Sequence, residues 1–170
     1  RARQGQPDVF WPGYIRKFAK SSGTTNAKSK FIPISEECLE DCHFKAGKDL
    51  LSIYANNHPD NSLFSNKNLR LGGSSELYED FNTKFGDLSA IMIENLPFWV
   101  EITTTPSKKV SLMSEWESKL KAIISEVKNE DVGSMTGVPS WMMVLLQRTL
   151  ADTGKQTISE IWPNLEVFFH

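Results

Sequence analysis

The chain has 170 residues, of which 39% are hydrophobic and 24% are charged, and its formal net charge is −2. This length is enough for one domain with a hydrophobic core, and the composition excludes an intrinsically disordered chain. The near-neutral charge argues against a nucleic-acid-binding surface, no apolar stretch reaches the roughly 20 residues of a membrane span, and the 2 cysteines are too few for a secreted disulfide scaffold. We therefore expect a cytoplasmic protein that binds neither nucleic acid nor a membrane.

The first elements expected along the chain are an irregular lead-in over residues 1–12 and a strand–turn–strand unit over residues 14–34. Ser35 then offers an N-cap to a helix that runs to about Tyr54. The apolar residues of this helix recur at spacings of three and four, which predicts one buried face made of Leu39, Cys42, Ala46, Leu50 and Ile53.

The two cysteines, Cys38 and Cys42, lie in this helix next to His43. Their spacing places both thiols on the face that carries Leu39 and Ala46, so we expect them to be packed in the core. The spacing also differs from the Cys-x-x-Cys-His pattern of haem attachment. The sequence therefore predicts no metal site at these residues.

The second half of the chain alternates strands with helices. We expect a short helix capped by Asp87 and ended by Pro97, while residues 76–86 and 98–100 show no clear preference. The other expected elements are a strand over 67–71 with a turn at 72–75, a helix over about 112–128, a strand over 132–136, a helix from Pro139 to about Gly154, a helical turn at 159–162 and a final strand over 165–169. This alternation predicts an α/β fold with a mixed, largely parallel sheet and flanking helices.

The ends of the chain indicate a fragment of a larger protein. The chain begins with Arg1 and ends at His170, directly after an apolar run that is typical of a buried strand. An interrupted sheet leaves an unpaired strand edge and apolar surface, and both are candidates for self-association.

The most distinctive stretch runs from Lys20 to Lys30, where hydroxyl side chains surround Gly23 between two lysines. Backbone amides, hydroxyls and ammonium groups in one turn are the donors that bind a polyphosphate. The stretch is not a Walker A loop, because Gly-x4-Gly-Lys-Ser/Thr is absent, and a plain Ser/Thr-rich hairpin turn is the alternative. The candidate nucleotide-binding residues are Ser21, Ser22, Gly23, Thr24, Thr25, Lys28 and Lys30.

A second candidate site lies between the strand expected at 132–136 and the helix that follows it. Loops at the carboxyl ends of strands are where α/β folds bind ligands. The candidate substrate-binding residues at this pocket edge are Thr136, Gly137, Val138 and Pro139.

The segment 18–25, continued by 28–33, resembles the phosphate-binding motif of acyl-adenylate-forming enzymes. More closely, it resembles the auxin-responsive-promoter family of acyl-acid amido synthetases, in its bacterial branch. Further segments agree with this family in the same order, and they are Trp11-Pro12-Gly13, Gly72-Gly73-Ser74, Gly86-Asp87-Leu88-Ser89, Thr136-Gly137-Val138-Pro139-Ser140-Trp141 and Ile161-Trp162-Pro163-Asn164-Leu165-Glu166. The resemblance implies that residues 1–170 are an incomplete N-terminal adenylating, luciferase-like domain, and that the C-terminal domain is absent.

The resemblance also implies an activity and its partners. A carboxylic acid would be activated with ATP and Mg²⁺ as an acyl-adenylate, and an amino acid would then attack the adenylate to form an amide. The partners would thus be a small-molecule carboxylic acid and an amino acid. Two alternatives stay open: an acyl-CoA ligase-like enzyme that forms a thioester, and a nucleotide- or anion-binding module without catalysis.

The chain departs from the family at several points. Asn26-Ala27 follow the hydroxyl cluster where many members carry Gly-Gly. The family's Tyr-Ala-Ser-Ser-Glu-like segment and its later Gly-Asp ribose-binding motif do not occur in the sequence. We therefore assign no catalytic residue, and we expect that residues 1–170 alone do not complete the reaction.

Overall fold

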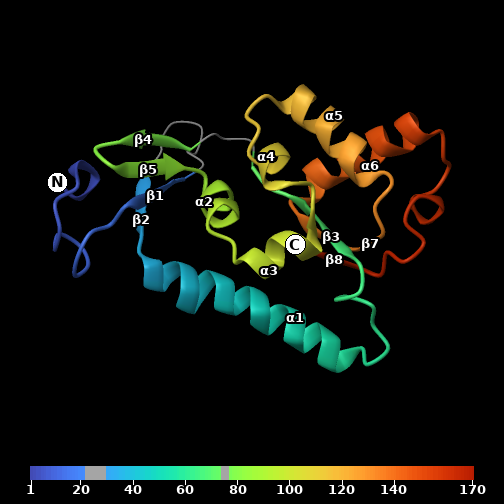
Figure 1. Cartoon of the computed structure of the whole chain (residues 1–170), viewed down its shortest axis with the longest axis horizontal. Coiled ribbons are helices and arrows are strands. Elements are labelled where there is room, and N and C mark those ends of the chain that lie inside the picture. Colours follow the sequence, from blue (N-terminus) through green and yellow to red (C-terminus); the bar gives the residue numbers. More distant parts are fainter. Residues whose placement is uncertain (22–29, 74–76) are drawn as a thin grey trace. The chain divides into compact units, whose positions relative to one another are not determined.

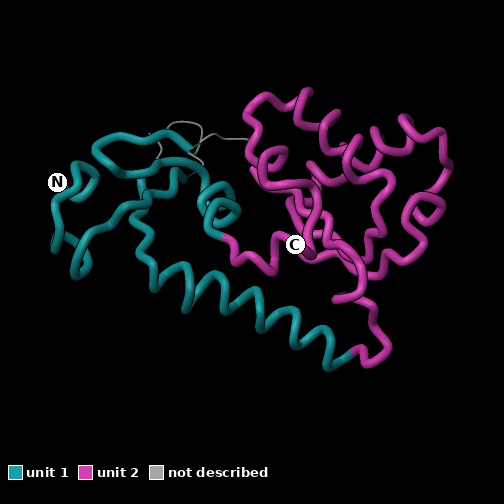
Figure 2. Tube along the Cα trace, viewed as in Figure 1, with its two compact units in different colours: residues 1–57, 75–95 teal, residues 58–74, 96–170 magenta. Residues whose placement is uncertain are grey.

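The computed structural model describes residues 1–21, 30–73 and 77–170. The chain divides into two compact units, Arg1–Asn57 with Ser75–Asn95, and His58–Ser74 with Leu96–His170 (Figure 2). Among the described residues, each unit contains one four-stranded sheet. Within the described ranges, no helix combines the length and the apolar character that crossing a bilayer requires.

The first unit is built on a mixed sheet with the strand order β2-β1-β5-β4 (Figure 1). Its strands are β1 (Lys17–Lys20), β2 (Phe31–Ile34), β4 (Tyr78–Asp80) and β5 (Thr83–Gly86). β1 pairs antiparallel with β2 and parallel with β5. The strand–turn–strand expectation is therefore confirmed in its two strands. Phe18 and Phe85 stack between β1 and β5, with their ring centroids 5.5 Å apart.

The hairpin of β4 and β5 lies in the segment for which the sequence showed no preference. Its strands pair antiparallel and are joined by only Phe81 and Asn82. Both turn residues have positive φ values, 48° and 58°, as in a two-residue type I′ hairpin turn. Because a phenylalanine rarely adopts positive φ, the sequence offered no turn signal here.

The helical segment after β2 begins as expected at Ser35, whose Oγ accepts a hydrogen bond from the Cys38 amide at 3.1 Å. The other helices of this unit are a short 3₁₀ turn η1 (Ala2–Gln4), the π-helical η2 (Cys38–Phe44), the α-helix α1 (Lys45–Asn57) that continues it, and α2 (Leu88–Glu94). The predicted N-cap at Ser35 is thus confirmed, whereas the π-helical turn was not expected.

The predicted buried face of this helix is confirmed at Leu39 and is wrong at Cys42, Ala46, Leu50 and Ile53. Leu39 and Phe44 are its buried residues, and their spacing of five matches the wider turn of a π-helix. Cys42 is exposed and Cys38 half-buried, so the expected packing of both thiols in the core is also wrong. In α1, no residue is buried, and Leu50 and Ile53 are 48% and 61% exposed.

The second unit contains an entirely parallel sheet with the order β6-β3-β7-β8. Its strands are β3 (Lys67–Leu71), β6 (Thr104–Thr105), β7 (Val132–Gly137) and β8 (Val167–Phe169). Its helices are α3 (Phe98–Thr103), α4 (Lys108–Ser111), α5 (Trp116–Val127), α6 (Pro139–Thr153) and the 3₁₀ turn η3 (Ile158–Glu160). The expected α/β fold with flanking helices is confirmed, with the strands divided between two sheets.

The core of the second unit lies between one face of its sheet and the helices α5 and α6 (Figure 1). Strands contribute Leu69, Leu71 and Met135 to this core, and the helices contribute Leu120, Ile123, Val127, Met142 and Leu145. The helix predicted over about 112–128 is confirmed, and its apolar stripe of Leu120, Ile123, Ile124 and Val127 is buried in this core.

The start of α5 differs from the sequence prediction, and a segment without a predicted state is helical. α5 begins at Trp116 rather than near residue 112, because the Glu115 carboxylate caps it by accepting from the amides of Glu117 at 2.9 Å and Ser118 at 2.7 Å. Residues 98–100, whose state was open, begin α3, and Phe98 is 78% exposed.

Candidate functional site

The base of the hydroxyl-rich loop is formed by Ser21 and Lys30. Ser21 directly follows β1, and Lys30 directly precedes β2. The Ser21 amide donates to the Lys30 carbonyl at 2.9 Å, and the Lys30 amide donates to the Ser21 Oγ at 3.0 Å. This pair of hydrogen bonds closes the loop at its base. Lys30, which carries an ammonium group, is exposed.

The remaining predicted nucleotide-binding residues, Ser22, Gly23, Thr24, Thr25 and Lys28, lie outside the described residues. Their proposed contacts with a nucleotide stay predictions.

The surroundings of the loop base follow from the parallel pairing of β1 and β5. Ala19 is the partner of Gly86, so the chain leaves both strands at the same edge of the sheet. From β5 it continues through Asp87 into α2, and from β1 it continues through Ser21 into the loop. The carboxyl ends of parallel strands are the usual ligand-binding edge of an α/β sheet.

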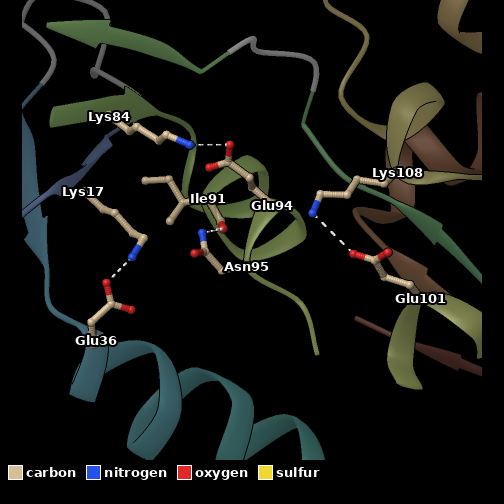
Figure 3. A network of polar contacts seen from close by, with 8 residues as sticks. All are labelled: Lys17, Glu36, Lys84, Ile91, Glu94, Asn95, Glu101 and Lys108. Atoms are coloured by element: carbon tan, nitrogen blue, oxygen red, sulfur yellow. Dashed lines mark hydrogen bonds and ion pairs between the residues drawn. The ribbon is translucent and has the colours of Figure 1, made fainter. Parts of the chain in front are cut away.

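Two lysine–carboxylate pairs support this sheet (Figure 3). Lys17 and Lys84 are register partners on β1 and β5, so their positive charges lie on neighbouring strands. Lys17 pairs with Glu36, and the Lys84 Nζ lies 2.6 Å from the Glu94 Oε1 at the end of α2. Each lysine therefore has its own carboxylate, which offsets the repulsion between them.

An apolar cavity of about 380 Å³ lies on another side of this unit, where the chain enters β1 and leaves β2. It is lined by Phe10, Trp11, Ile15, Pro33, Ser35, Glu37 and Cys38. Hydrogen bonds from its own backbone amide and from the side chains of Ser35 and Trp11 lower the pKa of Glu37. Sequence reasoning did not identify this cavity, because its lining comes from an irregular segment and from the helix start.

The predicted substrate-binding residues lie in the second unit, at the carboxyl end of β7. Thr136 and Gly137 end the strand, Val138 is the N-cap of α6, and Pro139 is its first residue. The Val138 carbonyl accepts the Met142 amide at 3.0 Å. Val138 and Pro139 are exposed, so this loop lies at the surface of the unit, and its role as a pocket edge stays a prediction.

Gly137 brings this loop against the end of β3. It is the register partner of Leu71, and a Cβ atom built on it would lie 2.7 Å from the Leu71 carbonyl oxygen and 3.2 Å from the Leu71 Cβ. Only a residue without a side chain allows this approach. Two segments therefore leave neighbouring strands at the same edge of the sheet: Gly72 and Gly73 after β3, and Thr136 to Pro139 at the end of β7.

A polar face of this sheet, opposite the core, leads to the same edge. The Asn68 Nδ2 donates to the Ser134 Oγ at 2.9 Å and to the Thr136 Oγ1 at 3.0 Å, which bridges β3 and β7. The hydroxyl of Thr136 is thus oriented by Asn68. Polar and apolar residues alternate over 67–71, and this alternation was the sequence signal that one face of the strand is polar.

Arg70 lies on the same polar face, two residues after Asn68. Its Nη1 donates to the Thr104 Oγ1 at 3.4 Å, and its Nε is buried without a partner among the described residues. Burial lowers the pKa of the guanidinium, and the negative charge of Glu101 opposes this effect. Arg70 stays charged, because an arginine does not lose its proton in proteins.

Sequence reasoning also missed the buried Lys119 of α5. It has no exposed surface. Its Nζ donates to the carbonyl oxygens of Ser111 at 2.7 Å, Gly73 at 2.8 Å and Gly72 at 3.4 Å. Lys119 lies three residues after Trp116 and four residues before Ile123, so it shares their face of the helix. This spacing was the sequence signal that could have predicted its burial.

Among the residues that the structure describes, no three His, Cys, Asp or Glu side chains gather in a way that would hold a metal ion. The two predicted groups, the hydroxyl-rich loop and the loop at Thr136 to Pro139, belong to different units.

Comparison with known proteins identifies the family. No curated protein matches the chain. Among solved structures, the chain is similar to one described as "AtGH3.15 acyl acid amido synthetase in complex with 2,4-DB", with a TM-score of 0.64 and 16% sequence identity over 88% of this chain and 26% of that chain. A structure described as "GH3.15 acyl acid amido synthetase" gives a TM-score of 0.63 at the same identity and coverage.

The chain thus spans about a quarter of the length of these two structures. At this identity, their likeness shows a shared fold. The family model of the GH3 family N-terminal domain matches residues 1–170. Since this match covers the whole sequence, the chain belongs to the GH3 family, which confirms the family resemblance of its motifs.

Proposed function

We propose that this chain is part of the N-terminal adenylating domain of an acyl-acid amido synthetase. The observation that carries the proposal is the match of the whole chain to the GH3 N-terminal domain. The closed loop base at Ser21 and Lys30, at the carboxyl end of β1, supports it, because it is compatible with a nucleotide phosphate site there. The acyl-acid amido synthetases among the similar solved structures support the same reaction.

The proposed reaction has two steps. A carboxylate oxygen attacks the α-phosphorus of ATP, the bond to the β-phosphate oxygen breaks, and pyrophosphate leaves. An amino-acid amine then attacks the acyl carbon, loses a proton and expels AMP, which leaves an amide. Donors that are oriented before the reaction stabilise the charge that builds up on the phosphates.

The residues proposed to bind ATP are those of the hydroxyl-rich loop. The Ser21 Oγ accepts the Lys30 amide, so its own proton is available for a phosphate oxygen. The exposed Lys30 adds a positive charge next to it. Mg²⁺ binds mainly phosphate oxygens and water in such sites, which is compatible with the absence of a metal-holding cluster among the described residues. When bound, the ion neutralises phosphate charge.

The acyl acid is proposed to bind at Thr136 to Pro139. This loop follows a parallel strand, is exposed, and lies beside the end of β3 through the close approach of Gly137 to Leu71. An exposed apolar residue, Val138, and an oriented hydroxyl, that of Thr136, suit the apolar and polar parts of a small carboxylic acid.

The experiment that tests the function is acid-dependent exchange of labelled pyrophosphate into ATP. The complete protein that contains this chain is expected to catalyse exchange with some carboxylic acids, and residues 1–170 alone are expected to catalyse none. Amino acids and coenzyme A are then compared as acceptors. Amide products support the proposal, thioester products indicate an acyl-CoA ligase, and nucleotide binding without exchange indicates a non-catalytic binding module.

A further inference from the structure

We propose that Lys119 is a positioning residue that holds the carboxyl end of β3 in the arrangement that the acyl-acid site requires. The inference rests on the proposed function, because it assigns the acyl acid to the loop at Thr136 to Pro139. It concerns a buried charged residue that contacts the backbone just after β3 rather than the loop at Thr136 to Pro139 itself.

The ammonium group of Lys119 joins three parts of the unit. Its Nζ donates to the carbonyl oxygen of Ser111, the last residue of α4, at 2.7 Å. It also donates to the carbonyl oxygens of Gly73 at 2.8 Å and Gly72 at 3.4 Å, directly after β3. The lysine itself belongs to α5, whose apolar residues form the core against the sheet. A lysine ammonium has three protons, and these three carbonyl groups can accept all of them.

Stability alone gives no reason for a lysine at this position. Burying an ammonium group removes its hydration, and an apolar side chain of similar volume is often equally or more stabilising. Lys119 has no exposed surface and lies on the apolar stripe of α5. What a lysine does here, and an apolar residue does not, is orient the three carbonyl groups.

The effect of Lys119 reaches the candidate site through the backbone. Gly72 directly follows Leu71, and the Leu71 carbonyl oxygen would lie 2.7 Å from a Cβ atom on Gly137. Because the trans peptide is planar, a Gly72 carbonyl turned toward Lys119 turns the Gly73 amide to the opposite side. A shift of Gly72 and Gly73 therefore moves Leu71, and with it the backbone of Gly137 and Val138.

The first test measures hydrogen exchange in the complete protein. Lys119→Met has a side chain of similar length but lacks the donors, and the matched control is Lys121→Met, an exposed lysine of the same helix. Amides of the peptide that covers residues 67–73 are expected to exchange about tenfold faster in Lys119→Met and at the wild-type rate in the control. Equal exchange rates in all three proteins would overturn the positioning role.

The second test separates positioning from stability through the Michaelis constants of pyrophosphate exchange. Lys119→Met is expected to raise the KM of the acyl acid about tenfold or more, because small displacements of binding groups are costly, while the KM of ATP stays within about twofold. A similar rise of both constants, or a lower melting temperature with both constants unchanged, would show a merely structural role.

A third variant keeps the test decisive if Lys119→Met does not fold. Lys119→Gln retains two amide donors without the charge, so it is expected to raise the KM of the acyl acid about threefold. Unchanged constants in this variant would overturn the proposal. A wild-type protein that activates no carboxylic acid would overturn the proposed function instead, and hydrogen exchange would still report on the contact of Lys119 with Gly72 and Gly73.

Discussion

Gly137 on β7 and Leu71 on β3 approach so closely that a Cβ atom on Gly137 would lie 2.7 Å from the Leu71 carbonyl oxygen. Because the oxygen belongs to the backbone, it cannot move aside without shifting the strand. The contact fixes the spacing of two parallel strands at the edge where the candidate acyl-acid loop begins.

Gly137→Ala is therefore expected to destabilise the protein by about 1–3 kcal/mol, because the new methyl group must separate β3 and β7. The control is Gly47→Ala in the exposed helix α1, where nothing lies within 4 Å of the new Cβ. Removing a helical glycine is expected to raise stability by up to about 1 kcal/mol. Urea unfolding measures both changes, and equal effects of the two substitutions would contradict the interpretation.

The N-cap of α5 predicts a pH-dependent contribution to stability. Hydrogen bonds from the side chain and the backbone amide of Ser118, and from the Glu117 amide, lower the pKa of Glu115. A carboxyl group with a lowered pKa in the folded state stabilises the fold above its unfolded pKa, about 4.3, and this contribution is lost as the pH falls through the folded value.

Glu115→Ala is accordingly expected to lower the melting temperature at pH 7, and the difference from wild type should shrink as the pH falls below about 4. Thermal unfolding between neutral and acidic pH checks this. Glu117→Ala is the control, since the Glu117 carboxylate forms an exposed pair with Arg148, at 3.4 Å, instead of capping the helix. A difference for Glu115→Ala that stays constant with pH would rule out the carboxylate cap as its origin.

We expect that a conservative substitution of Trp162 lowers the unfolding free energy strongly. Its Nε1 donates to the Val127 carbonyl at 3.1 Å, and the side chain is buried in the core of the second unit. Trp162→Phe is expected to cost about 2–3 kcal/mol, because it creates a cavity and removes the indole donor, although the Val127 carbonyl keeps the Glu130 amide at 3.1 Å. Trp141→Phe, at a partly exposed position, is the control and should cost less. Denaturant titration of both variants makes the comparison.

The pairing of Lys84 with Glu94 is expected to contribute more than that of Lys108 with Glu101, although both are partly exposed (Figure 3). The first pair is shorter, 2.6 Å against 3.3 Å, and Glu94 also offsets the proximity of Lys84 to Lys17. Glu94→Gln is expected to cost about 0.5–1 kcal/mol and Glu101→Gln less. Both costs should decrease in high salt, and a salt-independent cost would argue against an ionic origin.

Because Ser21 closes the base of the hydroxyl-rich loop, we expect its substitution to weaken the binding of ATP and not that of the acyl acid. Ser21→Ala removes the hydroxyl that accepts the Lys30 amide, so the loop loses one of its two closing hydrogen bonds. We expect about a tenfold rise in the KM of ATP and little change in the KM of the acyl acid. Ser52→Ala, on the exposed face of α1, is the control. Pyrophosphate exchange measures both constants, and a rise confined to the acyl acid would contradict the assignment of the loop to ATP.

Sequence reasoning was most reliable where structure depends on neighbours within a few residues. Local sequence signals predicted the N-cap at Ser35, the helix that begins at Pro139 and the helix that became α5, and all three are confirmed. It was wrong where local geometry departed from the usual period. The π-helical turn at Cys38–Phe44 kept Leu39 buried as predicted, but it buried Phe44 in place of Cys42, which is exposed.

By itself, the sequence determined the family, the alternation of strands and helices, and the position of two candidate loops after strands, because these depend on residue order and on short-range periodicity. Only the tertiary structure decided that β3 and β7 are neighbours, that Gly137 touches Leu71, and that Lys119 reaches the carbonyl groups of Gly72 and Gly73. These contacts join residues more than 40 positions apart, and such pairs are selected by the packing of a shared core, on which local spacing carries no information.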